Sequence, residues 1–536
     1  MNHTEWTVLD NSNIVESYPG LTLPLTHAFI RIAYEGVFRG LVGTILKNDV
    51  VLDKYSDIFA NMIADYQGRV YYRINNWYSL IDFLPFSRKI IPIWQDMMGV
   101  QNTDIYLGIR HKFTLRQKAA MNGRILKLAL SVPREMDRLN RDFQAVQNTF
   151  AETYQETMTN EELLALFQEI KDTVLTRWSV TLANDMYAFI WTGLLKRRLA
   201  RQGSDVTQSI AGITALESLK PLTKLLDIAQ HYAAANSAET GAEAASPEPT
   251  LSDTAEVREY LALYGDRCPG ELKLETVTYR EDPSLLEAKI REYAADPAKL
   301  DQIVDGLRRQ ETLPLRNSFI AKRARLGIKN REISRLNRSR IYGMVRRIFL
   351  TIGANLHRDG CLDAPTDVFY LTVGEIAAWD NPGGGAEDFK GIIAQRREEY
   401  TSYARLPTQP RLVFRGGELL ESKITPDWTG IFQGVGASFG NVTAAAVVLE
   451  SPHDNVDVKG KIIVTKTTDP GWVFLLTMAA GIVAEKGSLL SHTAIVSREL
   501  KIPAVVAVTR STSVIQTGDL LSIDGGSGEV RLLKEA

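Results

Sequence analysis

The sequence changes character near Asp427, and this change constrains the fold more than any other feature. Before it, apolar residues recur at helical spacing along extended segments. After it, short β-rich runs alternate with glycine-containing turns, and helical stretches at 471–480 and 491–500 interleave with them. Because 536 residues exceed what one hydrophobic core supports, we expect several domains. The predicted fold class is multidomain α + α/β, with a large, mostly helical N-terminal domain followed by a small α/β domain.

The helical region is expected to fall into two parts. Residues 236–253 are small, polar and proline-containing, which is typical of a flexible linker or loop. The expected organisation is therefore a first helical part at 1–235, the linker at 236–253, a second helical part at 254–425 and the α/β domain at 426–536.

Apolar spacing predicts the main elements of both helical parts. Helices are expected at 28–46, 53–66, 70–83, 116–149 and 160–200 in the first part and at 254–263, 283–295, 297–327, 331–354 and 388–405 in the second. The run 367–371 is expected to form a short strand.

Composition excludes several classes of function. The formal net charge is −2, which argues against a nucleic-acid-binding surface. Two cysteines, Cys268 and Cys361, without metal-ligand spacing around them, indicate a reduced cytoplasmic protein and no metal site. The N-terminus lacks the pattern of a signal peptide. The longest apolar run, 472–484, has about 13 residues, too few to span a membrane.

Basic residues cluster in two runs, at 322–325 and at 335–347. A solvated helix face is one interpretation of such runs. The other is a surface for anionic ligands or nucleotide phosphates. The sequence leaves both open.

His492 stands where a flexible turn becomes a helix. Gly487 and Ser488 supply the turn, Ser491 is a good N-cap residue, and Pro503 ends the helical pattern. A helix N-terminus offers free N–H donors and the positive end of the helix dipole, and both favour a bound phosphoryl group. An imidazole placed there can accept a phosphoryl group and pass it on. The alternative interpretation is an ordinary surface histidine after a loop.

The residues around His492 resemble the phosphohistidine, or swivelling, domain of the phosphoenolpyruvate-utilising enzymes. The resemblance runs through the words at 487–488, 491–495, 498–499 and 502–506, and extends to 434–442, 468–472 and 518–530. This family has glycine where Ser488, Lys501 and Ala507 stand here, and alanine at Ser497. The resemblance implies a β/β/α swivelling domain in which His492 carries the phosphoryl group. It also implies a phosphate-supporting role for Gly487, Ser488, Ser491 and Thr493.

The helical region resembles the acceptor-binding region of rifampicin-phosphotransferase-like proteins. The words that carry this resemblance lie at 13–26, 264–272 and 279–283, although the family often has histidine where Asp266 stands. We find neither an ATP-grasp domain nor a phosphoenolpyruvate-binding barrel in the chain. We therefore expect ATP and Mg²⁺ to be bound by a separate ATP-grasp partner protein, with no cofactor held by this chain.

These resemblances imply a phosphotransferase subunit. His492 would take the β-phosphoryl group of ATP from the partner and deliver it to a hydroxyl of a small organic acceptor in the helical domain. Such an acceptor needs a base, and its product needs cationic contacts. The candidate bases are Glu16, His27, Asp266 and Glu271, and the candidate anion-binding residues are Arg267, Arg338 and Arg340. Each has a structural alternative, namely a salt bridge or a helix cap.

Two other functions remain open. In the first, the chain is a phosphoenolpyruvate-synthase-like relay that passes phosphate from His492 to a protein partner. In the second, it is a degenerate family member used for assembly, although the intact word 491–493 counts against this.

Overall fold

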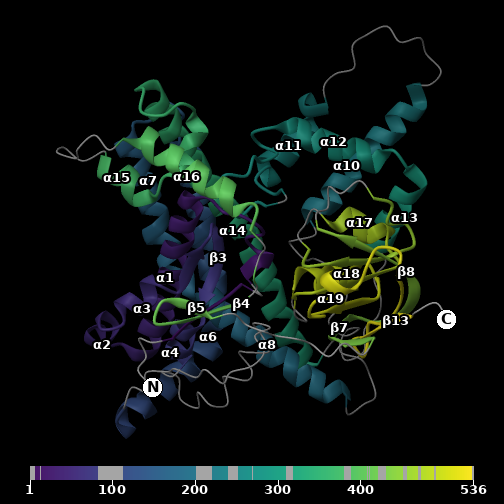
Figure 1. The fold of residues 1–536 in the computed structure, drawn as a ribbon, viewed down its shortest axis with the longest axis horizontal. Helices are drawn as coiled ribbons and strands as arrows, with labels where there is room; N and C mark the ends of the chain where they lie inside the picture. Colours follow the sequence, from purple (N-terminus) through teal and green to yellow (C-terminus); the bar gives the residue numbers. More distant parts are fainter. Residues whose placement is uncertain are drawn as a thin grey trace. The chain divides into compact units, whose positions relative to one another are not determined.

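The computed structural model describes residues 6–11, 14–81, 113–200, 220–239, 251–268, 270–308, 318–379, 388–406, 409, 411–420, 430–450, 456–468, 472–487 and 491–533 (Figure 1). They form two compact units. Unit 1 comprises Met1–Phe189, Leu272–Thr276 and Ile341–Thr425, and unit 2 comprises Ile190–Glu271, Val277–Arg340 and Pro426–Ala536. Each unit combines segments from distant parts of the sequence, and the three expected boundaries between the four predicted segments stay a prediction.

Unit 1 is built around helix α1 (Pro24–Leu46), which starts at a proline whose fixed φ suits the first helical position. Capping boxes begin its other long helices, with Thr114 before α6 (Leu115–Thr153) and Thr159 before α7 (Asn160–Thr173). The remaining helical segments are η1 (Ile14–Glu16), α2 (Asp49–Asp53), α3 (Ser56–Ala60), α4 (Ile74–Ile81), η2 (Leu175–Arg177), η4 (Pro365–Tyr370), α15 (Val373–Trp379) and α16 (Phe389–Tyr403). Helices α8 (Ser179–Ala200) and α14 (Phe319–Arg358) contribute residues to both units.

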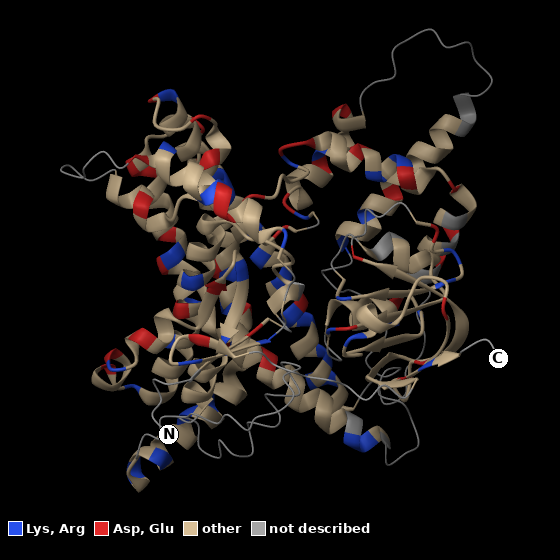
Figure 2. Ribbon diagram, viewed as in Figure 1, with Lys and Arg blue, Asp and Glu red and all other residues tan. Residues whose placement is uncertain are grey.

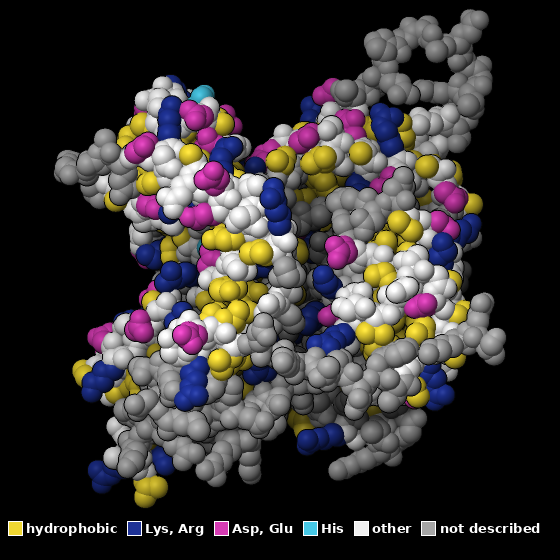
Figure 3. Space-filling view, in the orientation of Figure 1, with side chains coloured by type: hydrophobic (Ala, Val, Ile, Leu, Met, Phe, Trp, Pro, Cys, Tyr) yellow, Lys and Arg dark blue, Asp and Glu magenta, His cyan; other side chains and the backbone are white. Residues whose placement is uncertain are grey.

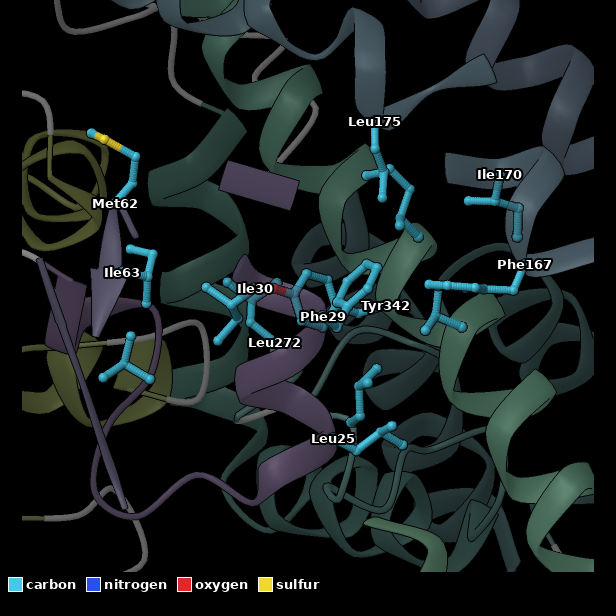
Figure 4. Close-up of a cluster of buried hydrophobic side chains, with 14 of the residues drawn as sticks. Leu25, Phe29, Ile30, Met62, Ile63, Phe167, Ile170, Leu175, Leu272 and Tyr342 are labelled. Carbon is cyan, nitrogen blue, oxygen red and sulfur yellow. The ribbon is translucent and has the colours of Figure 1, made fainter. Parts of the chain in front are cut away.

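The apolar stripe of α1 forms the centre of the core of unit 1. Leu25 and Phe29, one turn apart on the helix, are fully buried. Figure 4 shows them beside Phe167 of α7 and Tyr342 of α14. The rings of Phe29 and Tyr342 meet edge-on with their centroids 4.9 Å apart. Segments far apart in the sequence are therefore held together mainly by apolar and aromatic packing on this helix.

Unit 1 also contains an antiparallel sheet that the sequence interpretation missed. Its strands, in the order β2-β3-β1-β4-β5, are β2 (Ile63–Tyr66), β3 (Arg69–Arg73), β1 (Trp6–Asp10), β4 (Arg411–Arg415) and β5 (Glu418–Leu420). Strand β1 pairs with β4 from the other end of the chain. No local sequence pattern predicts that β1 pairs with β4, because the two strands are about 400 residues apart in the sequence.

Three expected elements of unit 1 are wrong. The expected helices at 53–66 and 70–83 contain the β2–β3 hairpin, although 74–81 is helical as α4. The hairpin turns at Gln67 and Gly68, both with positive φ (52° and 68°), as a two-residue turn of type I′ requires. The expected strand at 367–371 is the 3₁₀ helix η4, in which the carboxylate of Asp367 accepts from the N–H of Ala364.

The helical part of unit 2 is a small bundle with its own core. Its helices are α10 (Lys220–Glu239), η3 (Leu251–Asp253), α11 (Ala255–Tyr264), α12 (Pro283–Ala294) and α13 (Pro297–Arg308). Leu226, Val257, Leu286 and Ile290 are buried between them. Helix α10 runs into the start of the segment expected as a linker, and residues 240–250 lie outside the described residues.

The C-terminal part of unit 2 is a mixed sheet with helices against it. The strands are β6 (Ile431–Gln433), β7 (Val435–Ser438), β8 (Asn441–Leu449), β9 (Ile462–Thr465), β10 (Gly481–Ala484), β11 (Ala504–Val506), β12 (Leu520–Asp524) and β13 (Glu529–Leu533), and the helices are α17 (Val473–Met478), α18 (His492–Glu499) and α19 (Ser511–Val514). The strand order is β6-β13-β12-β8-β9-β10-β11-β7. Strands β8 to β11 pair in parallel, and the remaining pairs are antiparallel.

This sheet is buried on both faces. Along β9, Ile462 and Val464 belong to one buried cluster, whereas Ile463 belongs to the cluster under α17 and α18. Such alternation follows from the two-residue period of a strand, and burial on both faces explains why the run is wholly apolar. Only Gly434 separates β6 from β7, which lie at opposite ends of the strand order, so the sheet closes on itself. The expected fold class is confirmed, with a mostly helical N-terminal region and a C-terminal mixed-sheet region.

Charged residues are distributed unevenly along α14. Within 319–340 this helix carries eight Lys and Arg residues and one acid, Glu332 (Figure 2). They are not a simple solvated face, because Arg325, Arg338 and Arg340 are half-buried. Elsewhere, the face of the molecule in Figure 3 shows acidic and basic side chains interspersed.

Candidate functional site

His492 is the first residue of helix α18, directly after the loop that follows parallel strand β10 (Figure 1). This places it at the carboxyl end of parallel strands, where ligands bind in α/β sheets. The side chain of Ser491 caps the helix by accepting from the N–H of Ala494 at 3.4 Å. The imidazole is 9% exposed. The predicted N-cap and helix start are therefore both found, but in this conformation the ring is largely buried.

The neighbouring predicted residues hold this helix start in place. Gly487 has φ +127°, and a Cβ on it would lie 2.9 Å from the Oγ of Ser491, so the turn requires glycine. The hydroxyl of Thr493 bonds to the hydroxyl of Thr468 at 2.8 Å, and both residues are buried. Because that hydroxyl is engaged inside the domain, Thr493 can support a phosphoryl group through its backbone N–H. Ser488 lies outside the described residues.

The far end of α18 is fastened to strand β7. Arg498 donates through Nε to the carbonyl of Ala437 at 2.7 Å, and Ser438 donates to the carbonyl of Ser497 at 3.2 Å. The helix ends in a Schellman motif in which the N–H of Ile502 bonds to the carbonyl of Ser497. These bonds fix the direction of the helix and therefore the position of His492.

Two of the departures from the family pattern fall on unusual backbone positions. Lys501 has φ 57° and Ala507 has φ 58°, in the left-handed region that favours glycine. The chain therefore keeps the backbone conformation that glycine adopts most easily, without the glycine. Both positions lie outside the sequence word 491–493, which contains the predicted nucleophile His492.

Two acceptor-site candidates, Arg267 and Glu271, lie together in unit 2. Glu271 receives hydrogen bonds from the guanidinium of Arg267 and, at 2.6 Å, from the hydroxyl of Ser339. Arg267 also donates to the hydroxyl of Ser339 at 3.1 Å. Burial raises the pKa of Glu271, against the opposing effect of Arg267 and Ser339. Ser339 lies between Arg338 and Arg340 in the sequence of α14, and the charge of Arg338 also acts on Glu271.

Asp266 has a separate partner. Its carboxylate accepts from the Nε of Arg280 at 3.2 Å. Both acidic candidates of unit 2, Asp266 and Glu271, are therefore in ion pairs. This matches the structural alternative that the sequence left open for each of them.

The other two candidate bases lie in unit 1. His27 is in the first turn of α1, 5% exposed, with its Nε2 3.8 Å from a carboxylate oxygen of Asp65. Burial lowers the pKa of His27, and the nearby Asp65 opposes this effect. Glu16 is the last residue of η1, and its side chain lies outside the described residues. The structure therefore divides the predicted acceptor residues between two units instead of uniting them.

Sequence reasoning missed several partners of these residues. Asp65 was hidden inside a wrongly expected helix, and Ser339 between two arginines carried no signal of its own. Thr468 was visible only as the first residue of the family word 468–472. Glu275 lies three residues after the end of the acceptor-region word 264–272. A carboxylate placed just after such a word is the one signal that was available.

The described residues contain neither a metal-binding cluster nor a membrane-spanning helix. Across the described ranges, no group of three or more His, Cys, Asp or Glu side chains is arranged to hold a metal ion. No helix among the described segments combines the length and apolar character that crossing a bilayer requires.

Comparison with protein families identifies two regions of the chain. Residues 457–528 match the mobile domain of PEP-utilising enzymes, and residues 177–346 match the fourth domain of rifampicin phosphotransferase. The first contains His492. The second contains the Arg267, Glu271 and Ser339 network.

Similar proteins agree with these matches. An uncharacterized protein of Mycobacterium tuberculosis is 25% identical over 551 residues, which cover 98% of this chain and 61% of that protein. The rifampicin phosphotransferase of Bacillus cereus is 28% identical over 296 residues, 51% of this chain and 34% of that protein. A Streptomyces rifampicin phosphotransferase is 29% identical over 317 residues, 53% and 36% respectively. This chain thus spans less than two thirds of the length of these relatives. It combines the mobile, phosphohistidine domain of the PEP-utilising enzymes with the fourth domain of the rifampicin phosphotransferases.

Proposed function

We propose that this chain is a phosphotransferase in which His492 takes up a phosphoryl group and transfers it to a hydroxyl of a small organic acceptor. The observation that carries the proposal is the position of His492, the first residue of α18 inside the matched mobile domain. The matched fourth domain in the same chain supports the acceptor half of the reaction.

The local geometry suits a covalent phosphoryl carrier. A ring nitrogen of His492 attacks phosphorus, and the group it gains stands at the N-terminus of α18, where first-turn N–H groups and the helix dipole favour negative charge. A phosphohistidine divides the overall transfer into two displacements, each of which is easier. Because the ring is 9% exposed here, charging requires a movement that exposes it. The swivelling of this domain supplies such a movement in our proposal.

We further propose that the donor is ATP bound with Mg²⁺ to a separate ATP-grasp protein. The β-phosphoryl group would pass to His492 with AMP as the leaving group, and water would take the γ-phosphoryl group and release it as phosphate. The acceptor would bind in the helical region, and we propose that Arg267, Arg338 and Arg340 stabilise its phosphate product there. Since several relatives are named rifampicin phosphotransferases, rifampicin is the first acceptor to test.

The test uses two phosphoryl donors. Radiolabelled phosphoramidate, a small donor, asks whether His492 is nucleophilic without a partner protein. Labelled ATP with Mg²⁺ and an ATP-grasp protein asks whether the expected donor works, with β- and γ-labelled ATP compared. We expect acid-labile, alkali-stable label on the wild type from phosphoramidate and from β-labelled ATP. We expect none at this site in His492→Ala, and wild-type labelling in the control His357→Ala, which alters an exposed histidine of α14.

The outcomes separate the parts of the proposal. Labelling that persists at wild-type level in His492→Ala would show that the carrier is wrong. Label that moves to a protein instead of to rifampicin or another hydroxyl compound would favour the relay function. Label from γ-labelled ATP alone would contradict the proposed donor group.

A further inference from the structure

The N-terminus of α1 carries a buried polar cluster to which the comparisons assign no role. The N-cap residue, Leu23, has no side chain able to cap the helix. The carboxylate of Glu275 takes this role, accepting from the N–H of Leu23 at 2.9 Å and from the hydroxyl of Thr26 at 2.6 Å. Glu275 belongs to Leu272–Thr276, the short segment of unit 1 that lies between two stretches of unit 2. The helix start is therefore already neutralised by a carboxylate.

His27 lies in this cluster, and both of its ring nitrogens are buried. Among the described residues, neither nitrogen makes a hydrogen bond of acceptable geometry, although the backbone of Gly68 lies nearby. The hydroxyl of Thr22 is also buried without a partner there, while its N–H bonds to the carbonyl of Gly68 at 2.8 Å. Buried polar atoms are nearly always satisfied, so each exception needs an explanation. Three such atoms, the two ring nitrogens of His27 and the hydroxyl oxygen of Thr22, indicate a place where a ligand group or water belongs.

Gly68 packs closely against Tyr400 beside these atoms. Its φ is +68°, and a Cβ on it would approach Cε1 of Tyr400 to 2.9 Å. The hydroxyl of Tyr400 is held by donating to the carbonyl of Thr22 at 2.8 Å, so the ring does not easily yield. The glycine therefore serves close packing as well as the turn.

Asp65 connects His27 to solvent. Its carboxylate lies 3.8 Å from Nε2 of His27 and is 45% exposed. The other charged groups that act on the imidazole are Glu275 and Arg31, the former favouring its protonation and the latter opposing it. A proton taken up by His27 is thus stabilised mainly by carboxylates and has a route to water.

Two of the other candidate bases face cations. Glu271 is bonded to Arg267 and Ser339, and Asp266 is paired with Arg280. In each, a guanidinium occupies a carboxylate oxygen. The charged group that acts most strongly on His27 is instead the carboxylate of Asp65, and burial keeps the His27 ring neutral near pH 7.

We infer that His27, assisted by Asp65, is the catalytic base that accepts the proton of the acceptor hydroxyl. This inference rests on the proposed function, and it places the reactive hydroxyl at the start of α1. In the step, the hydroxyl proton passes to a ring nitrogen of His27 as the oxygen attacks phosphorus. The bond between phosphorus and the nitrogen of His492 breaks, and its electron pair returns to that nitrogen. His492 leaves as neutral imidazole because its other nitrogen carries a proton.

The experiment separates charging from discharge. The full chain is charged with labelled phosphoramidate, freed of donor, and followed as it discharges to water, phenol and rifampicin in parallel between pH 5 and 9. We expect His27→Gln to charge as the wild type does but to discharge about 100-fold more slowly to the acceptor that the wild type uses fastest. The ratio of the wild-type rate to the His27→Gln rate should rise with pH to a plateau, because the protonation of phosphorylated His492 affects both proteins equally and only the wild type has the base.

Two further variants make the result decisive. Asp65→Asn, changed at a half-exposed side chain, should slow discharge about 10-fold, since a positioned acid–base assistant contributes less than the base itself. His357→Gln, an exposed histidine in unit 1, should behave as the wild type. Equal discharge rates and equal pH profiles of wild type and His27→Gln with all three acceptors would overturn the inference. If His27→Gln does not fold, discharge of Asp65→Asn at the same rate as the wild type would overturn the inference. Failure of the wild type to charge would instead count against the proposed function.

Discussion

Helix α1 of unit 1 and helix α18 of unit 2 both begin with a buried histidine in the first turn, but their surroundings differ. Helix α18 is capped by the uncharged hydroxyl of Ser491, the residue next to His492. Helix α1 is capped by Glu275, about 250 residues further along the chain, and a second carboxylate, Asp65, stands beside His27. The two sites share a residue type in the first helical turn but not their electrostatics.

This difference teaches which chemistry each histidine suits. A neutral cap leaves the partial positive charge of the helix N-terminus for an incoming anion, which favours a phosphoryl group on His492. A carboxylate cap already occupies that charge in α1, and the neighbouring carboxylate of Asp65 stabilises a proton on His27. A helix start with a histidine is therefore insufficient to predict a phosphohistidine.

The largest expected effect tests this contrast directly. After treatment with phosphoramidate, mass-spectrometric mapping should find phosphate on His492 and none on His27, because the carboxylate of Glu275 already occupies the N-terminus of α1. His492→Gln should lose the modification at that site completely, whereas His27→Gln should keep it. Phosphate on His27 at a level comparable with His492 would break the comparison.

The next effect concerns the cap of α1. Glu275→Ala removes two hydrogen bonds to a carboxylate from the helix start and should lower the local stability of unit 1 by about 2 kcal/mol. Hydrogen exchange of peptides from residues 24–46 measures this directly. The control is Glu161→Ala, an exposed glutamate in the first turn of α7. Equal exchange in the two variants would show that Glu275 does not cap the helix.

The pH dependence of unit 1 gives a third effect. Burial lowers the pKa of His27 below its usual 6.5, so below pH 6.5 the unfolded chain binds a proton that the folded chain does not. The contribution of His27 to stability is therefore present above pH 6.5 and is lost as the pH falls, by at most about 1.4 kcal/mol per pH unit. Hydrogen exchange of α1 peptides between pH 5 and 7.5 should show this slope in the wild type and a smaller one in His27→Gln. Identical slopes of stability against pH in the two proteins would show that a group other than His27 binds the proton.

The C-terminal domain was predictable because its determinants are local. Ser491, His492 and Pro503 lie within one short stretch, and the cap, nucleophile and stop of the helix are encoded there in order. The alternation of β9 likewise follows from the strand itself, in which Ile462 and Ile463 face opposite sides. Where neighbours in sequence are neighbours in space, residue patterns suffice.

Unit 1 was less predictable because its determinants are distant. Strand β1 has β4 as its partner, and the cap of α1 comes from Glu275. Neither segment contains a sign of the other. The site followed the same rule, since Asp65 is brought to His27 only by a hairpin whose two strands fall largely within the segments expected as helices at 53–66 and 70–83. The sequence named His27 but not the group that defines its chemistry.

The smallest effect comes from the opposite ends of the same two helices, where they agree. Helix α1 ends at Lys47 with φ 49°, and helix α18 is followed by Lys501 with φ 57°; both lysines are exposed. A side chain in this left-handed conformation costs about 1 kcal/mol, which glycine avoids. Lysine near a helix C-terminus offsets part of this cost through its favourable interaction with the helix dipole.

We therefore expect Lys47→Gly and Lys501→Gly each to slow the hydrogen exchange of its own helix by an equivalent of about 0.5 kcal/mol. Lys54→Gly, at an ordinary helical φ of −63°, should destabilise instead. If Lys501→Gly also destabilised, the lysine would have to be held there by contacts of its side chain, and the two helix ends would differ as their beginnings do.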